Sequence, residues 1–186
     1  MLPEEAWVAA DSTAFTSNHA SEYFEFRRAR DGKKISIRNW PKLGFVVEPR
    51  SHLILGITLG QGLSYDFRLW EPLLTQAVRH VKITLAMADA GFDSEANHVI
   101  ARQQLGVRRT LINLNRRGNG RRIHGRYRRE MSRGFDHRAY GQRWQAETAA
   151  SQMKRRFGAV LSARTEATQQ SELELKVLTH NIAIVP

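Results

Sequence analysis

The sequence of 186 residues contains no cysteine. This absence excludes disulfides, cysteine-based zinc fingers and thiol catalysis, and it favours the interior of a cell as the compartment. No apolar run approaches the roughly 20 residues that a membrane-spanning helix needs. The N-terminus has the acidic residues Glu4 and Glu5 where a signal peptide would have basic ones. We therefore expect a cytoplasmic protein with no membrane partner.

Lysine is absent from the most basic part of the chain. Residues 108–138 contain eleven arginines against two acidic residues, which is +9 of the net charge of +11. So dense an arginine cluster repels itself unless an anion binds, and the guanidinium group suits bidentate phosphate contacts. The stretch indicates a nucleic-acid partner, with a solubilising loop as the alternative. The candidate DNA-binding residues here are Arg116, Arg117, Arg121, Arg122, Arg126, Arg128 and Arg129.

Hydrophobic periodicity and turn residues predict an α/β fold in one domain. The predicted strands are residues 6–11, 43–48, 53–59, 83–89 and 110–114, and the second and third form an antiparallel hairpin. The predicted helices are residues 67–80, 95–105, 140–156 and 171–184. Together these elements indicate a mixed five-stranded sheet flanked by helices, with a basic insertion before the helix of residues 140–156.

Three carboxylates lie at positions in the predicted elements where they could form a metal site. Asp11 closes the first predicted strand, Asp89 closes the fourth, and Glu147 lies within the helix of residues 140–156. Ends of adjacent central strands lie close together, so the three acids can converge. Converging anions repel one another unless a cation neutralises them, and hard oxygen ligands select Mg²⁺ or Mn²⁺. The alternative for Asp11 and Asp89 is an ordinary role in turns.

Two further aspartates are predicted to have only local roles. Asp66 precedes the helix of residues 67–80, and Asp93 precedes the helix of residues 95–105. Both are good N-cap residues at these positions, because a short carboxylate can accept the unpaired N–H groups of a first helical turn. We therefore leave both out of the predicted site.

The helix predicted for residues 140–156 carries an unusual polar stripe. At about 100° per residue, Tyr140, Arg143, Glu147, Ser151 and Lys154 fall within an arc of roughly 80°. A neighbouring arc is apolar and suits packing on a sheet. That apolar arc consists of Ala146, Ala149, Ala150, Met153, Phe157 and Val160. The alternative for the stripe is a solvated face with Arg143–Glu147 and Glu147–Lys154 ion pairs.

These residues resemble the signature blocks of bacterial insertion-sequence transposases of the DDE class. The blocks are DSTAF beginning at Asp11, ADAGFDS around Asp89, and the Tyr-Arg-Glu-Lys pattern of Tyr140, Arg143, Glu147 and Lys154. The linking stretch WPKLGFVVE also looks similar, as do LILGI and the closing HNI. The resemblance spans nearly the whole chain, from about Trp7 to Ile184.

The resemblance implies a ribonuclease H-like fold and a role for each block. In this family Asp11, Asp89 and Glu147 would be catalytic and would bind Mg²⁺ or Mn²⁺, as a pair of ions. Tyr140, Arg143 and Lys154 would hold DNA phosphates near the cut end. Residues 1–186 would form a single catalytic domain, with the Arg-rich insertion at about 115–138 touching DNA. The N-terminal DNA-recognition domain that is usual in the family is expected to be absent.

The implied function is cleavage of DNA at the ends of an insertion sequence and transfer of the cut strand to target DNA. The partners are therefore the transposon ends and the target DNA, and a homodimer is left open. Two alternatives also stay open. One is a ribonuclease H-like nuclease without strand transfer, and the other is a non-catalytic DNA-binding remnant of a transposase.

Overall fold

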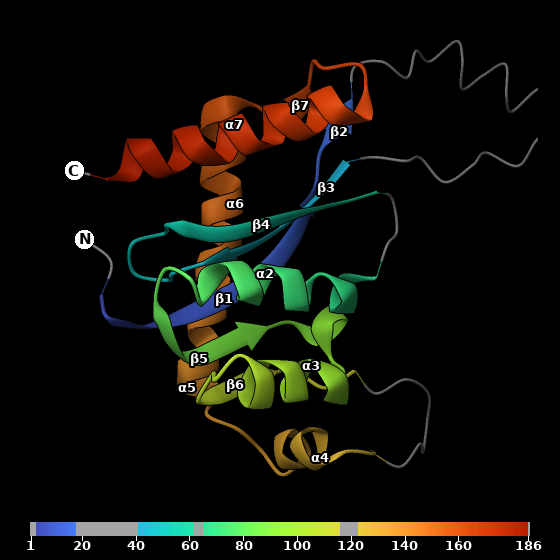
Figure 1. Ribbon diagram of the computed structural model, residues 1–186, viewed down its shortest axis with the longest axis vertical. Coiled ribbons are helices and arrows are strands. Elements are labelled where there is room, and N and C mark those ends of the chain that lie inside the picture. The colour runs from blue at the N-terminus through green and yellow to red at the C-terminus, as the bar shows by residue number, and fades with distance from the viewer. Residues whose placement is uncertain (1–2, 18–40, 62–64, 116–122, 186) are drawn as a thin grey trace, which may run out of the picture.

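The computed structural model describes residues 3–17, 41–61, 65–115 and 123–185. A mixed five-stranded sheet lies at its centre, with the strand order β4-β3-β1-β5-β6 (Figure 1). The strands are β1 (Glu5–Ala14), β3 (Pro41–Val47), β4 (Ile54–Gln61), β5 (Lys82–Ala88) and β6 (Arg109–Ile112). β1, β5 and β6 are parallel, and β3 runs antiparallel to β1 and β4. The predicted fold class agrees with this architecture.

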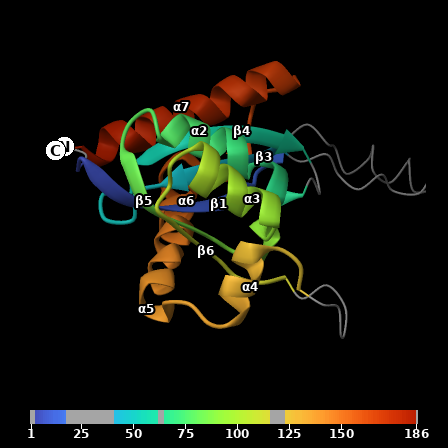
Figure 2. The ribbon, with the colours of Figure 1, turned by 60° about the horizontal axis from the view of Figure 1, so that its bottom comes forward.

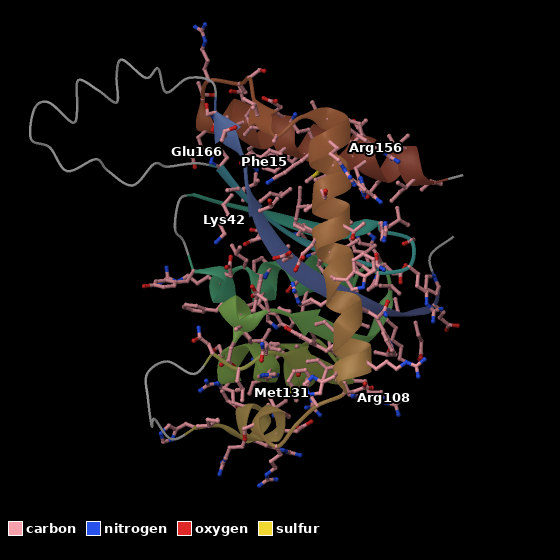
Figure 3. The ribbon with its side chains drawn as sticks, turned by 180° about the vertical axis from the view of Figure 1, so that it is seen from behind. Phe15, Lys42, Arg108, Met131, Arg156 and Glu166 are labelled. Atoms are coloured by element: carbon pink, nitrogen blue, oxygen red, sulfur yellow. The ribbon has the colours of Figure 1, made fainter. Side chains whose placement is uncertain are left out.

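Helices cover both faces of the sheet. The α-helices are α2 (Trp70–Ala77), α3 (Glu95–Val99), α4 (Arg126–Ser132), α5 (His137–Tyr140), α6 (Trp144–Phe157) and α7 (Glu166–Ile184). α2 and α3 lie on one face and α6 crosses the other, as the opposite views in Figure 1 and Figure 3 show. α7 packs on β4 and α6. Figure 2 shows α4 beside α3 at one end of the sheet.

The short elements join these layers. They are the 3₁₀ turns η1 (Asp66–Arg68), η2 (Ala90–Phe92) and η4 (Gly141–Arg143), the π-helical turn η3 (Ile100–Gln104), and the parallel pair β2 (Thr16–Ser17) and β7 (Val160–Leu161). None of the helices formed by the described residues combines the length and apolar character needed to cross a membrane.

Alternation along β1 divides the core into two layers. Ala6, Val8 and Ala10 are buried under α2 and α3, whereas Ala9 and Phe15 are buried under α6 and α7. This is the period-two pattern of a strand that is covered on both faces. Asp11 belongs to the second set by its register. The strand therefore directs this carboxylate toward α6.

The structure changes several predicted boundaries. β1 continues past Asp11 to Ala14, because β3 still pairs with it there, so Asp11 does not close the strand. The helix predicted for residues 140–156 is interrupted: α5 ends at Tyr140, and Gly141 begins a 3₁₀ turn before α6. Glycine has the weakest helix propensity after proline, which favours the break here. Val160 lies beyond α6, in β7, and is exposed.

The last helix begins earlier than predicted. α7 starts at Glu166, where the Thr165 and Thr168 side chains form a capping box. The usual signal for this motif is Glu or Gln at the third helical position. Thr168 takes the place of that residue here, so the sequence pattern does not predict the start of α7.

Two side-chain amides form hydrogen bonds with the backbone of the edge strand β4. Gln76 of α2 accepts from Ile57 N at 3.1 Å and donates to Ile57 O at 2.7 Å. Asn181 of α7 makes the same pair of contacts with Ile54, at 2.9 and 2.8 Å. These contacts occupy backbone groups that an edge strand otherwise offers to another chain.

We predict that Gln76→Met lowers the free energy of unfolding by about 1–3 kcal/mol, because it leaves both polar groups of Ile57 without their side-chain partner. Urea unfolding followed by circular dichroism measures the loss. Gln170→Met, at an exposed position of α7, is the matched control. Equal stability of the two variants would contradict the assigned role of Gln76.

Candidate active site

Asp11 and Asp89 meet where the pairing of β1 with β5 ends. The last pair in that parallel register is Ala10 with Ala88, and each aspartate is the next residue of its own strand or loop. Asp89 caps the η2 turn by accepting from Gly91 N at 2.8 Å. Asp11 accepts from Ser12 N, also at 2.8 Å. The two aspartates therefore follow the last paired residues of neighbouring strands, although only Asp89 lies beyond the end of its strand.

Glu147 approaches the same place from α6, which packs across β1 and β3. Its position follows from the buried strip of Ala146, Ala149, Ala150 and Met153, which holds that side of the helix on the sheet. The pKa of Asp11 rises from its usual 3.8 to about 6, first because the carboxyl is buried and then through repulsion by Asp89 and Glu147. Arg143 partly offsets this. The three predicted acids are therefore electrostatically coupled.

Arg143 holds Glu147 in an ion pair across one helical turn. The distance from Arg143 Nη2 to Glu147 Oε1 is 2.6 Å, and the Glu147 side chain is 58% exposed. The Arg143 guanidinium also lies 5.9 Å from the centre of the Tyr140 ring. The first of the two ion pairs in the alternative interpretation of this stripe is thus present.

Lys154 has a different environment. Its ammonium lies 5.2 Å from the centre of the buried Phe15 ring, and burial lowers its pKa. Within the described residues no carboxylate lies within ion-pair distance of it, so the Glu147–Lys154 pair of the alternative interpretation is not formed. Figure 3 places Phe15 and Lys42 on the same side of α6.

Asp66 also faces this site, contrary to its predicted role. Tyr65, not Asp66, is the N-cap of η1. The Asp66 carboxylate accepts from Ser12 Oγ at 2.7 Å and pairs with Lys42 Nζ at 2.6 Å. No local signal separates such an acid from a cap, because its partners are 54 residues before it, at Ser12, and on β3. Because Asp66 precedes a helical turn, the sequence predicted a cap and did not predict these tertiary contacts.

Asp93 likewise is no simple cap. Its side chain is fully buried and pairs with Arg128, with Nη2 to Oδ2 at 2.7 Å and Nε to Oδ1 at 2.9 Å. It also accepts from Asn115 N at 2.8 Å. Glu95 accepts from the backbone N of Tyr127 and Arg128 at the start of α4. These two acids therefore anchor both flanks of the Arg-rich segment to the loop that follows Asp89.

Gly125 makes the Glu95 contact feasible. Its φ of +95° belongs to the region that glycine adopts readily, and a Cβ there would lie 2.2 Å from Glu95 Oε2. Any other residue would push the carboxylate away from the N–H groups of α4.

The predicted DNA-binding arginines have unequal surroundings. The Arg128 guanidinium is engaged with Asp93, whereas Arg126 and Arg129 are exposed. Arg126 lies 5.5 Å from the Tyr127 ring centre, and Arg129 donates to Gly125 O at 2.8 Å. Four of the predicted residues lie outside the described residues: Arg116, Arg117, Arg121 and Arg122.

The chemistry of the site suits a divalent cation. A buried carboxyl repelled by two others is the electrostatic condition that a cation relieves. As the side chains stand, no three His, Asp or Glu residues in the described ranges are drawn close enough to hold one ion. Glu147 Oε1 contacts Arg143, and Asp89 Oδ1 contacts Gly91 N. Sharing an ion would therefore require these carboxylates to change partners.

The chain belongs to the transposase DDE domain family, which it matches over residues 4–182. Its mixed five-stranded α/β fold is the ribonuclease H-like fold of that family, and the family assignment implies a transposition-related nuclease that acts on DNA with divalent metal ions. No curated protein matches the sequence.

We predict that Asp11→Asn stabilises the metal-free protein at neutral pH. The folded-state pKa of Asp11, about 6 against 3.8, means that the folded protein loses stability as pH rises from about 4 to about 6. The variant lacks this loss, so it should exceed the parent by about 1–3 kcal/mol at pH 7.5 and by nothing at pH 3.5.

Urea unfolding in EDTA at both pH values tests this. Glu71→Gln, at an exposed position of α2, is the charge-matched control and should show no such difference. A stability gain for Asp11→Asn that does not change with pH would contradict the assignment.

We also predict an asymmetry in the Asp93–Arg128 pair. Arg128→Met leaves a fully buried carboxylate without its cation and should cost about 3–5 kcal/mol. Asp93→Asn should cost less, because the Arg128 side chain is 23% exposed and can turn to water. Urea unfolding compares the two, with Arg129→Met as an exposed control. A larger loss for Asp93→Asn would contradict the role of Asp93 as the buried anchor.

Proposed function

We propose that this chain cleaves DNA at the ends of an insertion sequence and transfers the cut strand to target DNA. In this proposal Asp11, Asp89 and Glu147 are the catalytic carboxylates, and they hold two Mg²⁺ or Mn²⁺ ions. The observation that carries the proposal is the position of Asp11 and Asp89 directly after the last Ala10–Ala88 pair of β1 and β5, with α6, which carries Glu147, packed across β1.

The three acids would supply hard oxygen ligands for the ions. When bound, such ions lower the pKa of water and stabilise charge on a phosphoryl group during in-line displacement. The protein's own contribution is rigidity. Asp11 lies on the rigid strand β1, and Glu147 lies on α6, which its buried strip holds on the sheet.

Arg143 links the acidic site to DNA. Its guanidinium forms an ion pair with Glu147. If Glu147 turns toward Asp11 and Asp89, Arg143 loses this partner and becomes available for a phosphate. Tyr140 lies one turn before it and Lys154 lies further along α6, so the three groups can hold the backbone of a strand next to the scissile bond.

The Arg-rich segment would extend this contact. Arg126 and Arg129 are exposed on α4, and the anchors made by Asp93 and Glu95 hold α4 close to the loop of Asp89. Arg116, Arg117, Arg121 and Arg122 would add charge between these anchored flanks. Phosphate binding by such a segment releases counter-ions, so DNA affinity should fall steeply with salt.

We predict that Glu147→Gln lowers Mg²⁺-dependent nicking of DNA by about 100-fold or more, because the loss of a metal ligand removes several kcal/mol of transition-state stabilisation. DNA affinity should be retained, since the substitution frees Arg143. Nicking of plasmid DNA and fluorescence anisotropy with a labelled duplex measure the two effects. Glu174→Gln, at an exposed position of α7, is the control.

Two outcomes would favour the alternatives. A parent protein that binds DNA but does not nick it in Mg²⁺ or Mn²⁺ would support a non-catalytic remnant. Nicking without joining of pre-cleaved ends to target DNA would support a nuclease that lacks strand transfer.

A further inference from the structure

Asp66 links the η1 turn to β1, beside Asp11, and to β3. One carboxylate oxygen, Oδ1, accepts from Ser12 Oγ at 2.7 Å and pairs with Lys42 Nζ at 2.6 Å. Ser12 directly follows Asp11 on β1, and Lys42 lies on the neighbouring strand β3. Both members of the ion pair are largely buried, with side chains 13% and 24% exposed. Water therefore screens this contact less than it screens a surface pair.

The second oxygen of Asp66 faces the loop of Asp89. A Cβ built on Gly91 would lie 3.0 Å from Asp66 Oδ2 and 3.0 Å from Asp89 Oδ1. The two carboxylates thus border the same small space, which the missing side chain of Gly91 leaves open. Gly91 N donates to Asp89 Oδ1. The η2 turn therefore binds Asp89 through its backbone, and its glycine leaves space for the Asp66 carboxylate.

We propose that Asp66 is a positioning residue of the active site. Through Ser12 and Lys42 it fixes the η1 turn to β1, directly after Asp11, and to the neighbouring strand β3. Through its Oδ2 edge it adds negative charge beside the place where a metal ion would bind. This inference rests on the proposed metal-dependent function and adds a residue that contacts neither DNA nor the reacting atoms.

The charges around the site support this role. Among the described residues, two cations form ion pairs with the acids of this site: Arg143 pairs with Glu147, and Lys42 pairs with Asp66. Lys42 therefore opposes the attraction of the site for a metal ion, and Asp66 contributes to it. The two members of one ion pair should then affect metal affinity in opposite directions. A pair that only holds the fold together would affect it in the same direction.

The test measures Mn²⁺ affinity on the full chain, from the rise in melting temperature with Mn²⁺ concentration relative to EDTA. Asp66→Asn should weaken Mn²⁺ binding about 10- to 100-fold, the range found when a group that orients metal ligands is removed. Lys42→Met should tighten it, because the site loses a repelling charge. Glu71→Gln, on α2 near Asp66, changes charge equally without contacting the site and should leave the affinity unchanged.

Gly91→Ala gives a second, uncharged probe that does not remove the ion pair. Its methyl group would stand between Asp66 and Asp89 and should weaken Mn²⁺ binding while Glu71→Gln does not. This variant decides the matter if Asp66→Asn melts too low in EDTA to be titrated.

The outcomes separate the inference from the proposed function. Unchanged Mn²⁺ affinity in Asp66→Asn and Gly91→Ala, with loss of binding in Asp11→Asn, would overturn the role of Asp66 alone. A loss in both Asp66→Asn and Lys42→Met would reduce the pair to a structural one and also overturn it. Parent-like Mn²⁺ affinity in Asp11→Asn and Glu147→Gln, or no Mn²⁺ binding by the parent, would overturn the proposed metal site and the inference with it.

Discussion

The parallel pairing of β1 with β5 is the contact on which the site depends. It ends at Ala10 and Ala88, and the two residues that follow are aspartates in adjacent positions at a partly buried edge. Neither strand could shift by one residue without moving its apolar set to the wrong face. The core packing of Ala9, Ala10 and Ala88 therefore enforces the approach of two like charges. The pKa of Asp11 is raised first by burial of its carboxyl and to a smaller extent by repulsion from Asp89.

Other carboxylates around this edge of the sheet each pair with a specific cation. Arg143 neutralises Glu147, Lys42 neutralises Asp66, and Arg128 neutralises the buried Asp93. The Arg143–Glu147 pair spans one turn at the start of α6, whereas the other two pairs join separate segments: β3 to the η1 turn, and the Arg-rich segment to the loop after Asp89. The arginines of this segment therefore have two kinds of surroundings: Arg128 is paired with a buried acid, whereas Arg126 and Arg129 are exposed.

Much of the fold could be predicted because its signals are local. Short apolar runs predicted the five strands of the sheet, with alternation along residues 53–59, and the turn after Val47 predicted the hairpin. The apolar strip of α6 could be predicted from helical spacing, and its first four members are buried. Boundaries were less accurate where a tertiary contact extends an element, as β3 does for β1 beyond Asp11, or where an uncommon cap begins one, as Thr165 and Thr168 do for α7.

The sequence by itself determined which residues could form the site: Asp11, Asp89 and Glu147 follow from their order, their strand or helix positions and the family resemblance. Only the tertiary structure decided the partners of Asp66, Asp93 and Arg128. A carboxylate before a helical turn has the same local pattern whether it caps that turn or crosses to another strand. An arginine in a basic run likewise has the same local sequence pattern whether its side chain lies in solvent or pairs with a buried acid. Those choices depend on desolvation and on contacts between segments far apart in the chain, which no local pattern encodes.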